Sequence, residues 1–412
     1  MFSRTKETQT DGTSLKGTHS AGEDGQLRRS ITGHPSNLSA TQEDALHKFR
    51  EEITAAGLYV PRSTPDGRRA SHTDVALLRF LRARRFDVGK AMKQFTDEEN
   101  WRHKYNVNEL YLNFPVDEME ASKKFYPTWT GRRDRRGLPI YVYRLADLDS
   151  ARQKELSVVS SDRRYQRIIA LYEYMLQGVL NLCAALAKDT PSAINSASGV
   201  TSSLPPSQVS SVTTMVDLAG VSLSQLWNIR SHLQQASNLA TANYPETLNS
   251  ILVLNAPGFF PTAWNWFQGF FDQGTREKIK ILGNPSKDPS TLDVMTRYIA
   301  KENIPKAYGG DLDWTTGDDP KFDEPAGEWL RDNMNLDVIR GPLVIDPWGD
   351  VTDGRAANSD AGSSVGDSGV GIGGTGPGGL SLELEPPSPG PVEGMDKSPE
   401  LLVPSGTPTE GL

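Results

Sequence analysis

Residues 244–283 read YPETLNSILVLNAPGFFPTAWNWFQGFFDQGTREKIKILG, and this stretch decides the fold that we expect. Residues 250–255 form a short run of mostly branched apolar side chains. Such a run, bounded by turn residues, predicts a strand that is buried on both faces. Residues 256–258, Ala-Pro-Gly, end the run. The stretch therefore begins as a central strand of a sheet that is covered on both sides.

An aromatic block follows this strand. Seven of the thirteen residues from 259 to 271 are aromatic: Phe259, Phe260, Trp264, Trp266, Phe267, Phe270 and Phe271. On a helical count, Trp264, Phe267 and Phe271 share one face. Trp266 and Phe270 share another. A helix that is apolar around most of its circumference is either buried or turned toward lipid at times.

Two interpretations of this aromatic helix stay open: a core helix of a large domain, or a movable gate over an apolar cavity. Gly269 and Gly274 interrupt the helix, which lowers its stability and allows hinging. Thr275 and Lys278 place a polar pair beside the helix, and Glu246 places a carboxylate before the strand that leads into it. These polar neighbours favour the gate.

The order of these motifs resembles the CRAL-TRIO lipid-binding family. YPE, a strand, NAP, an aromatic helix and D-x-x-T-x-x-K-I-x-I-L-G are most similar to fungal phosphatidylinositol/phosphatidylcholine transfer proteins. The similarity continues in ENIP at 302–305, YGG at 308–310 and LLRFLRARRFD at 77–87, and it covers roughly residues 34–315. The resemblance implies an α/β fold: a mixed or parallel sheet covered by helices, a hydrophobic pocket with a helical gate, and a small N-terminal all-α domain.

The resemblance also implies a phosphatidylinositol site of six residues: Arg84, Arg85, Asp134, Glu246, Thr275 and Lys278. A phosphodiester is an anion, so Lys278 can offset its charge and Thr275 can donate a hydrogen bond to it. Glu246 and Asp134 can accept hydrogen bonds from inositol hydroxyls, and Arg84 can donate to them. The alternatives are structural: a Glu246–Lys278 ion pair, and an interdomain salt bridge made by the two arginines.

A phosphatidylcholine site is implied at Tyr141, Tyr174 and Thr214. The two tyrosine rings match aromatic positions of the family and can face the choline cation. Thr214 matches one of the family's phosphate-binding hydroxyls, but its partner two residues earlier is Val212, and Thr130 stands where the family has a tyrosine. These departures weaken the prediction for choline lipids, and the alternative is that these strand and helix residues are core.

Composition divides the rest of the chain. We expect four parts: residues 1–33, disordered; 34–105, the N-terminal helical domain; 106–315, the lipid-binding domain, with a flexible insertion at 189–209; and 316–412, a mostly disordered extension. In the helical domain, Ser39 fits a capping box. A later helix that begins at residues 73–74 should display Arg79, Arg82 and Arg85.

Charge and cysteine usage limit the function classes. The chain of 412 residues has a net charge of −8, which argues against an electrostatic nucleic-acid binder. Its one cysteine, Cys183, rules out an internal disulfide and a Cys-cluster metal site, and favours a reducing compartment. Cys183 lies in an apolar run and is expected in the core. We expect no membrane span, because no stretch of eighteen apolar residues was found, and no secretory signal.

The enzyme-like motifs in this sequence lack the surrounding structure that catalysis needs. G-x-S-x-G at 362–366 and G-x-G-x-x-G at 369–374 lie in the low-complexity tail, without the strand and helix that such motifs need. His232 is the only histidine between residues 106 and 315, and it falls in the middle of a predicted helix, which disfavours a Ser-His-Asp hydrolase. We therefore expect a binding protein with no cofactor other than a bound phospholipid as cargo.

The predicted function is exchange of phosphatidylinositol and phosphatidylcholine between membranes. Two alternatives remain: a carrier of another hydrophobe such as a sterol or isoprenoid, and a lipid-regulated scaffold or small-GTPase regulator. Glu246 with Lys278 argues against the first. The expected partners are the phospholipid, a membrane surface contacted transiently and, as a candidate, a phosphoinositide kinase. The expected location is cytoplasmic, peripheral to Golgi or endosomal membranes.

The predicted mechanism follows from the free energy of removing acyl chains from water. Two chains of about 16 carbons, at about 0.8 kcal/mol per CH₂, represent on the order of 25 kcal/mol of burial. An exposed groove could not hold them against water, so the protein must enclose them and open only at a membrane. We expect the helix with the five aromatics from Trp264 to Phe271 to swing out there, with Gly269 or Gly274 near the hinges.

Overall fold

The computed structural model describes residues 32–35, 37–63, 67–188, 209–271 and 273–348. Several predictions lie outside these residues: the disorder of residues 1–31, nearly all of the insertion at 189–209, and the tail after residue 348 with its two enzyme-like motifs. The account below concerns the described residues only.

The N-terminal part is helical, as expected. It consists of α2 (Ala40–Ala55), α3 (Asp74–Ala83), α4 (Val88–Tyr105), α5 (Val107–Leu112) and α6 (Val116–Lys123). The predicted capping box is confirmed: the Gln42 backbone N donates to Ser39 Oγ at 3.3 Å, and the Ser39 backbone N donates to Gln42 Oε1 at 3.0 Å. Leu46, Phe49 and Ile53 of α2 pack against α3 and α4 in one hydrophobic cluster.

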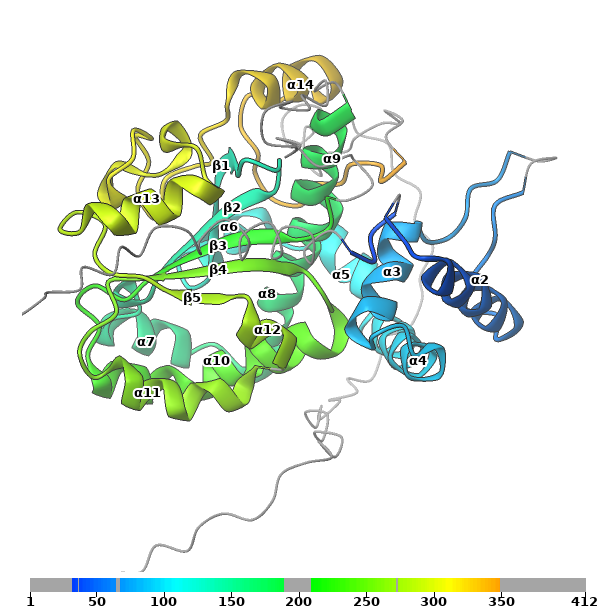
Figure 1. The fold of residues 1–412 in the computed structure, drawn as a ribbon, viewed down its shortest axis with the longest axis horizontal. Coiled ribbons are helices and arrows are strands. Elements are labelled where there is room, and N and C mark those ends of the chain that lie inside the picture. Colours follow the sequence, from blue (N-terminus) through cyan, green and yellow to red (C-terminus); the bar gives the residue numbers. More distant parts are fainter. Residues whose placement is uncertain (1–31, 36, 64–66, 189–208, 272, 349–412) are drawn as a thin grey trace, which may run out of the picture. The chain divides into compact units, whose positions relative to one another are not determined.

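A five-stranded mixed sheet forms the centre of the remaining chain (Figure 1). Its strands are β1 (Thr128–Arg133), β2 (Pro139–Arg144), β3 (Val212–Asp217), β4 (Leu248–Leu254) and β5 (Ile279–Ile281). They lie side by side in chain order; β1 is antiparallel to β2, and the other neighbours are parallel. The run of apolar residues in the opening stretch forms β4, the predicted buried strand.

Helices connect the parallel strands and cover both faces of the sheet. Between β2 and β3 lie η1 (Leu145–Asp147), α7 (Ser150–Ser157), α8 (Ser161–Glu173), the π-helical η2 (Tyr174–Leu180) and α9 (Asn181–Lys188). The later elements are α10 (Leu223–Asn243), α11 (Phe260–Phe267), η4 (Gln268–Phe270), α12 (Gln273–Glu277), α13 (Pro289–Tyr298), η5 (Lys301–Asn303), η6 (Lys306–Tyr308) and α14 (Glu324–Met334). Figure 1 shows α10 and α11 on one side of the sheet and α13 on the other.

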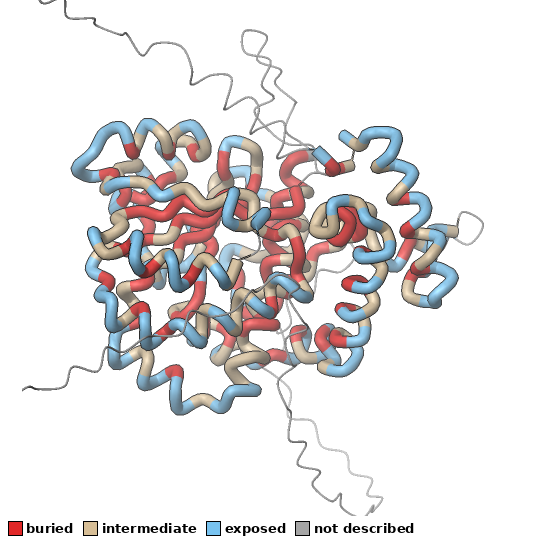
Figure 2. The backbone as a smooth tube through the Cα atoms, turned by 60° about the horizontal axis from the view of Figure 1, so that its bottom comes forward, coloured by how far each residue is buried: buried red, intermediate tan, exposed pale blue. Residues whose placement is uncertain are grey.

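Side chains alternate between the two faces of the strands. Ile140, Met215 and Leu252 point toward α13 and belong to a closed hydrophobic cluster with Met295. The residues next to them in sequence point to the opposite face, toward α8, α10 and α11, where the cavity described below lies. Figure 2 shows burial concentrated along the strands and the elements packed on them.

One helical run has the length and composition of a membrane span. Residues 161–187, which join α8, η2 and α9, are apolar enough by hydropathy, contrary to the expectation that no such stretch exists. However, 67% of the most apolar window is buried inside the protein. The run also carries the charged Glu173, which is 1% exposed. We therefore assign it to the core and call it the core helix.

Glu173 is the centre of a buried polar cluster. Arg102 donates to both of its carboxylate oxygens, from Nη1 at 2.8 Å and from Nη2 at 3.1 Å, and the Tyr244 hydroxyl donates to Oε1 at 2.8 Å. Burial alone would raise the pKa of Glu173, but Arg102 and these hydrogen bonds outweigh it and lower the pKa. The cluster joins α4, the core helix and the end of α10.

The arginines of α3 correct one expectation. Arg79 and Arg82 are not displayed to solvent; only Arg85 is exposed. Arg79 is half-buried near Glu98 and Glu173, and burial lowers its pKa to about 10. The LLRFLRARR pattern has too many apolar residues for one face, so α3 is enclosed on several sides and its arginines meet buried carboxylates.

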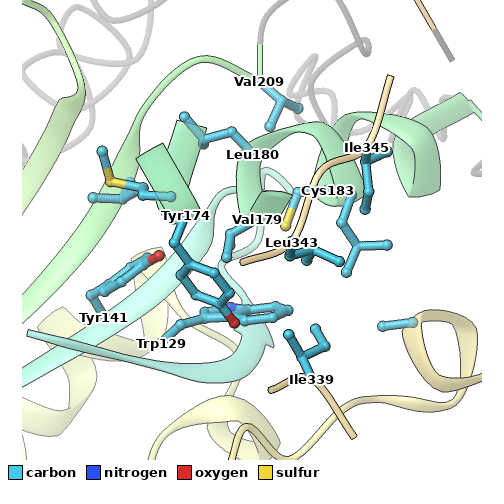
Figure 3. Packing of buried hydrophobic residues seen from close by; sticks show 14 of the residues in the cluster. Trp129, Tyr141, Tyr174, Val179, Leu180, Cys183, Val209, Ile339, Leu343 and Ile345 are labelled. Atoms are coloured by element: carbon cyan, nitrogen blue, oxygen red, sulfur yellow. The ribbon is translucent and has the colours of Figure 1, made fainter. Parts of the chain in front are cut away.

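Residues 316–348 are folded, which the expectation of a mostly disordered extension did not foresee. The Tyr111 hydroxyl donates to the Leu343 carbonyl at 2.8 Å and accepts from the Leu343 backbone N at 2.8 Å. Figure 3 shows Leu343 and Ile345 packed beside Cys183 of α9. Cys183 is buried in the core as predicted, and burial raises the pKa of its thiol to about 12.

Replacing Arg102 by Met tests the Glu173 cluster. The carboxylate would stay buried with its main cation removed, so we expect the free energy of unfolding to fall by about 3–5 kcal/mol. Chemical denaturation measures the change. Lys93→Met is the matched control: it breaks an exposed ion pair with Asp97 on α4, and should cost at most about 0.5 kcal/mol. Equal losses in the two variants would contradict the role given to Glu173.

Candidate functional site

An apolar cavity of about 540 Å³ lies between the sheet and the helices α8, α10 and α11. Its floor is formed by the inward-facing residues of the strands: Tyr141, Tyr143, Val212, Thr214, Val216, Ile251, Val253 and Ile279. The core helix contributes Leu171 and Met175, and α10 contributes Leu226 and Leu233. The volume falls in the range of small-molecule and cofactor sites. The interior is thus not filled by its own side chains.

Polar groups gather at one end of this cavity, next to the amino ends of the parallel strands. Lys278 Nζ lies 3.0 Å from Glu246 Oε2, and both side chains are about one quarter exposed, at 23% and 26%. Thr275 and Arg84 line the same region. Five of the six residues expected to meet a phosphoinositol headgroup, all except Asp134, therefore line the cavity and come from three separate parts of the chain.

Arg82 belongs to this polar end, although the sequence analysis did not select it. Its Nη2 donates to the Glu246 carbonyl at 3.3 Å and lies 3.9 Å from Glu246 Oε2. Burial lowers the pKa of Arg82, and Glu246 opposes that shift. Glu246 itself has φ 58°, in the left-handed region that residues other than glycine rarely adopt. Arg82 thus holds the strained residue that presents the carboxylate.

Arg85 makes a contact that differs from both expectations for it, headgroup binding and an interdomain salt bridge. Its Nη2 donates to Gln273 Oε1 at 3.4 Å, which links the end of α3 to α12 by a hydrogen bond instead of a salt bridge. Arg84, one residue earlier, forms no ion pair among the described residues. Its side chain borders the cavity and is half-buried.

Asp134 does not lie at the cavity, which corrects its predicted place among the headgroup residues. Its Oδ1 accepts from the backbone N of Arg136 at 2.9 Å and of Leu138 at 3.0 Å. Its Oδ2 accepts from Thr213 Oγ1 at 2.9 Å. Thr213 points to the face of β3 opposite to that of Thr214. The carboxylate is therefore used to build the β1–β2 turn.

The residues predicted to bind choline are split between two places. Tyr141 and Thr214 line the cavity, together with Val212. Tyr174 does not; Figure 3 shows it packed beside Trp129 in the buried cluster. Lys123 Nζ lies 5.1 Å from the centre of the Tyr174 ring, so this ring already faces a cation of the protein. Tyr141 and Tyr174 belong to one buried hydrophobic cluster, but of the two only Tyr141 lines the cavity.

The aromatic gate differs in shape from the predicted helix. Helix α11 ends at Phe267, a 3-10 turn spans Gln268–Phe270, and Phe271 is extended. Trp264, Phe267, Phe270 and Phe271 line the cavity. Trp266 is 41% exposed on the outer side. Phe270 and Trp266 thus lie on opposite sides, because the 3-10 turn rotates Phe270 away from the face that an uninterrupted helix would give it.

The gate is held against α10 by two contacts. Ser237 Oγ donates to the Phe270 carbonyl at 2.7 Å. The rings of Trp227 and Trp266 meet edge to face, with centroids 5.4 Å apart. Gly269 has open space around it, and its φ is not in the left-handed region. A side chain at this position would therefore meet no neighbouring atom.

His232 of α10 lines the cavity, and the sequence analysis considered it only as a catalytic base. Its ring lies 5.2 Å from that of Tyr126. Burial, and to a lesser extent Arg164, lowers the pKa of His232 to about 4. The side chain is therefore neutral at neutral pH, as an apolar cavity requires. In the described part of the chain, no group of three His, Cys, Asp or Glu residues could hold a metal ion.

The low pKa of His232 predicts a pH dependence of stability. From its usual value near 6.5 down to about 4, the unfolded chain binds a proton that the folded protein excludes. The free energy of unfolding should therefore fall as pH falls through this window. Denaturation at several pH values should show a shallower fall in His232→Gln. His103→Gln, on the exposed side of α4, should keep the wild-type slope; an unchanged slope in His232→Gln would contradict the assignment.

Comparisons with known proteins match both parts of the fold. The CRAL/TRIO domain matches residues 122–310, and the CRAL/TRIO N-terminal domain matches residues 45–97. The Sec14 cytosolic factor of Schizosaccharomyces pombe is 31% identical over 303 residues, covering 73% of this chain and 94% of that protein. The SEC14 cytosolic factor of Candida glabrata is 30% identical, covering 68% and 82%. An Arabidopsis thaliana phosphatidylinositol/phosphatidylcholine transfer protein, SFH9, is 28% identical, covering 65% and 41%.

Proposed function

The chain belongs to the CRAL/TRIO domain family, and from this premise we propose that it binds phospholipids and exchanges phosphatidylinositol and phosphatidylcholine between membranes. The names of its relatives, among them a transfer protein for these two lipids, support the proposal. The observation that carries it is the apolar cavity with Lys278 and Glu246 at one end. A cavity of this kind suits a ligand with a long apolar body and an anionic, hydroxyl-bearing head.

The apolar walls hold the acyl chains. Lipid chains gain about 0.8 kcal/mol per CH₂ when they leave water, so a phospholipid stays in the cavity only while water is excluded. The side chains of Phe267, Phe270 and Phe271 close the cavity on the gate side. At a membrane the leaving lipid enters the bilayer as another takes its place, so the net change in free energy of one exchange is small.

The charges at the polar end fit a phosphodiester linked to a ring of hydroxyls. In the structure Lys278 is paired with Glu246, which also lies near Arg82. Because Arg82 remains as a second cation, Lys278 can turn to a phosphate without leaving the Glu246 carboxylate uncompensated. Glu246 then accepts hydrogen bonds from the ring hydroxyls, Arg84 donates to the ring oxygens, and Thr275 donates to a phosphate oxygen.

Choline lipids have fewer dedicated partners. Tyr141 offers a ring, and Thr214 offers a hydroxyl, at the cavity wall. Val212, beside them, has no hydroxyl, and Tyr174 lies outside the cavity against Lys123. We therefore propose that the two lipids are distinguished mainly by whether the headgroup contacts Lys278 and Glu246.

The proposal has three further parts. The protein binds lipid without catalysing a reaction, and it is cytoplasmic, with transient attachment to Golgi or endosomal membranes. It delivers the inositol lipid to a phosphoinositide kinase. The relatives named cytosolic factors support the location. A sterol or isoprenoid carrier remains the second candidate, and it is favoured only by the apolar walls. A sterol or isoprenoid has no phosphate group to pair with the charged side chains at the end of the cavity.

Lipid analysis of the purified protein separates these candidates. The full chain should carry extractable phosphatidylinositol or phosphatidylcholine, detected by mass spectrometry, at close to one lipid per protein molecule. The same protein should move labelled phospholipid between donor and acceptor vesicles. Recovery of only sterol or isoprenoid would overturn the proposal, and binding without transfer would favour a lipid-regulated scaffold.

Lys278→Ala should separate the two lipids in this transfer assay. Loss of a charge-assisted hydrogen bond costs about 1.5–3 kcal/mol, so phosphatidylinositol transfer should fall about 10- to 100-fold, and phosphatidylcholine transfer by less than about three-fold. Lys280→Ala is the control, because Lys280 lies two residues after Lys278, in β5, and its ammonium group lies over the Tyr298 ring. Equal loss of both activities in Lys278→Ala would refute the assignment of Lys278 to the inositol headgroup.

A further inference from the structure

The layer formed by α10 and the gate has an unusual charge content. These elements lie side by side on one side of the sheet (Figure 1). The 21 residues of α10 contain one charged side chain, Arg230, and the residues of α11 and η4 contain none. No acidic residue occurs in either, although 23% of the residues in the chain are charged and its net charge is −8. The outer surface of this layer therefore presents no carboxylate of its own.

Large apolar side chains are exposed on the same layer. On α10, Leu223 is 37% exposed and Trp227 is 49% exposed. Arg230 follows three residues after Trp227, so the three side chains lie along one side of the helix. The Trp227 ring meets Trp266 of α11, which is 41% exposed. We call Leu223, Trp227, Arg230 and Trp266 the tryptophan stripe.

Arg230 completes the stripe as a cation beside an aromatic ring. The centre of its guanidinium group lies 4.0 Å from the centre of the Trp227 ring. This pairing leaves the guanidinium at the exposed end of the stripe, where it can bind an anionic oxygen. Tryptophan prefers the headgroup level of a bilayer, and an arginine next to it can reach lipid phosphates.

We propose that the tryptophan stripe is a membrane-docking surface, in which Trp227 and Arg230 of α10 form a fixed anchor beside the moving gate. The proposal rests on the proposed function for the identity of the gate. Charge complementarity supports a phospholipid surface as the occupant, because the only charge on the layer is positive. Position supports it as well: the opposite sides of α10 and α11 line the cavity, so a bilayer on the stripe lies directly outside the gate.

Helix α10 is held firmly enough to serve as a fixed anchor. Near its start, Gln225 Nε2 donates to the carbonyls of Leu145 at 3.1 Å and Leu148 at 2.9 Å. Near its end, the carbonyls of Thr241 and Ala242 each accept from Gln94 Nε2 at 3.0 Å. The gate, in contrast, is joined to α10 by the Trp227–Trp266 ring contact, by one hydrogen bond to the Phe270 carbonyl, and by non-directional apolar contacts within one hydrophobic cluster. Trp227 can therefore stay in the headgroup layer while the gate opens and Trp266 moves away from the Trp227 ring.

Sedimentation of the full-length protein with vesicles tests the anchor. We expect Trp227→Ala to lower the apparent affinity about ten-fold, for vesicles of phosphatidylcholine alone and for vesicles that also contain phosphatidylserine. Arg230→Gln should lower the affinity about five-fold for the phosphatidylserine vesicles and by less than about two-fold for phosphatidylcholine alone. Trp227→Phe should keep most of the binding.

Two control variants remove similar groups elsewhere. Trp348→Ala deletes a tryptophan that is 37% exposed after α14, and Arg62→Gln deletes an exposed arginine between α2 and α3. Both should bind vesicles as the wild type does. Thermal unfolding of every variant should match the wild type, and the amount of lipid carried by each purified variant should be unchanged, since the stripe does not line the cavity.

The outcomes separate this surface from the transfer function. Unaltered vesicle binding by both Trp227→Ala and Arg230→Gln, or absence of vesicle binding by the wild type, overturns the docking surface. A change of oligomeric state in Trp227→Ala with normal vesicle binding also overturns it and indicates a contact between protein chains. A wild-type protein that binds vesicles through the stripe but carries and transfers no phospholipid leaves the docking surface standing and refutes the proposed function.

Discussion

One buried carboxylate constrains the arrangement of the whole protein. Glu173 lies in the core helix with 1% of its surface exposed, where an unpaired charge would be strongly unfavourable. Its partners are Arg102 from the N-terminal helices and Tyr244 from the end of α10. Satisfying this one charge therefore fixes three separate elements relative to one another. The hydrophobic clusters around it stabilise the fold, but they are less directional, and they would allow the elements to shift.

The geometry of the site follows from this constraint. Tyr244, held by Glu173, begins the short segment that ends in Glu246 with its left-handed backbone. Arg82 then holds the carbonyl of Glu246, and Lys278 pairs with its carboxylate from the start of β5. The N-terminal helices are thus part of the site, because they supply the cation that keeps Glu246 oriented.

A single layer of helices separates the cavity from the surface, and this explains the sequence of the gate. Each residue of α11 must face either the apolar cavity or the exterior, since no other described helix or strand lies outside this layer. Phe267 and Phe271 face the cavity, whereas Trp266 faces outward beside Trp227. Aromatic residues on both sides of such a helix are unfavourable for a protein that stays in water. They become favourable if the outer side meets the headgroup region of a bilayer.

The sequence by itself determined the fold class and predicted a buried strand at residues 250–255, which the structure places at 248–254. It also located the aromatic run after this strand, and it offered an ion pair between Glu246 and Lys278 as the structural alternative to headgroup binding. These features depend on local patterns of apolar residues and on a motif order that the family shares. Only the tertiary structure decided that Arg82 supports Glu246, that Asp134 serves a turn, that Tyr174 faces Lys123, and that residues 316–348 are folded. Arg82 and Glu246 are 164 residues apart, and the direction of a side chain across such a distance depends on how the elements pack, which no local pattern encodes.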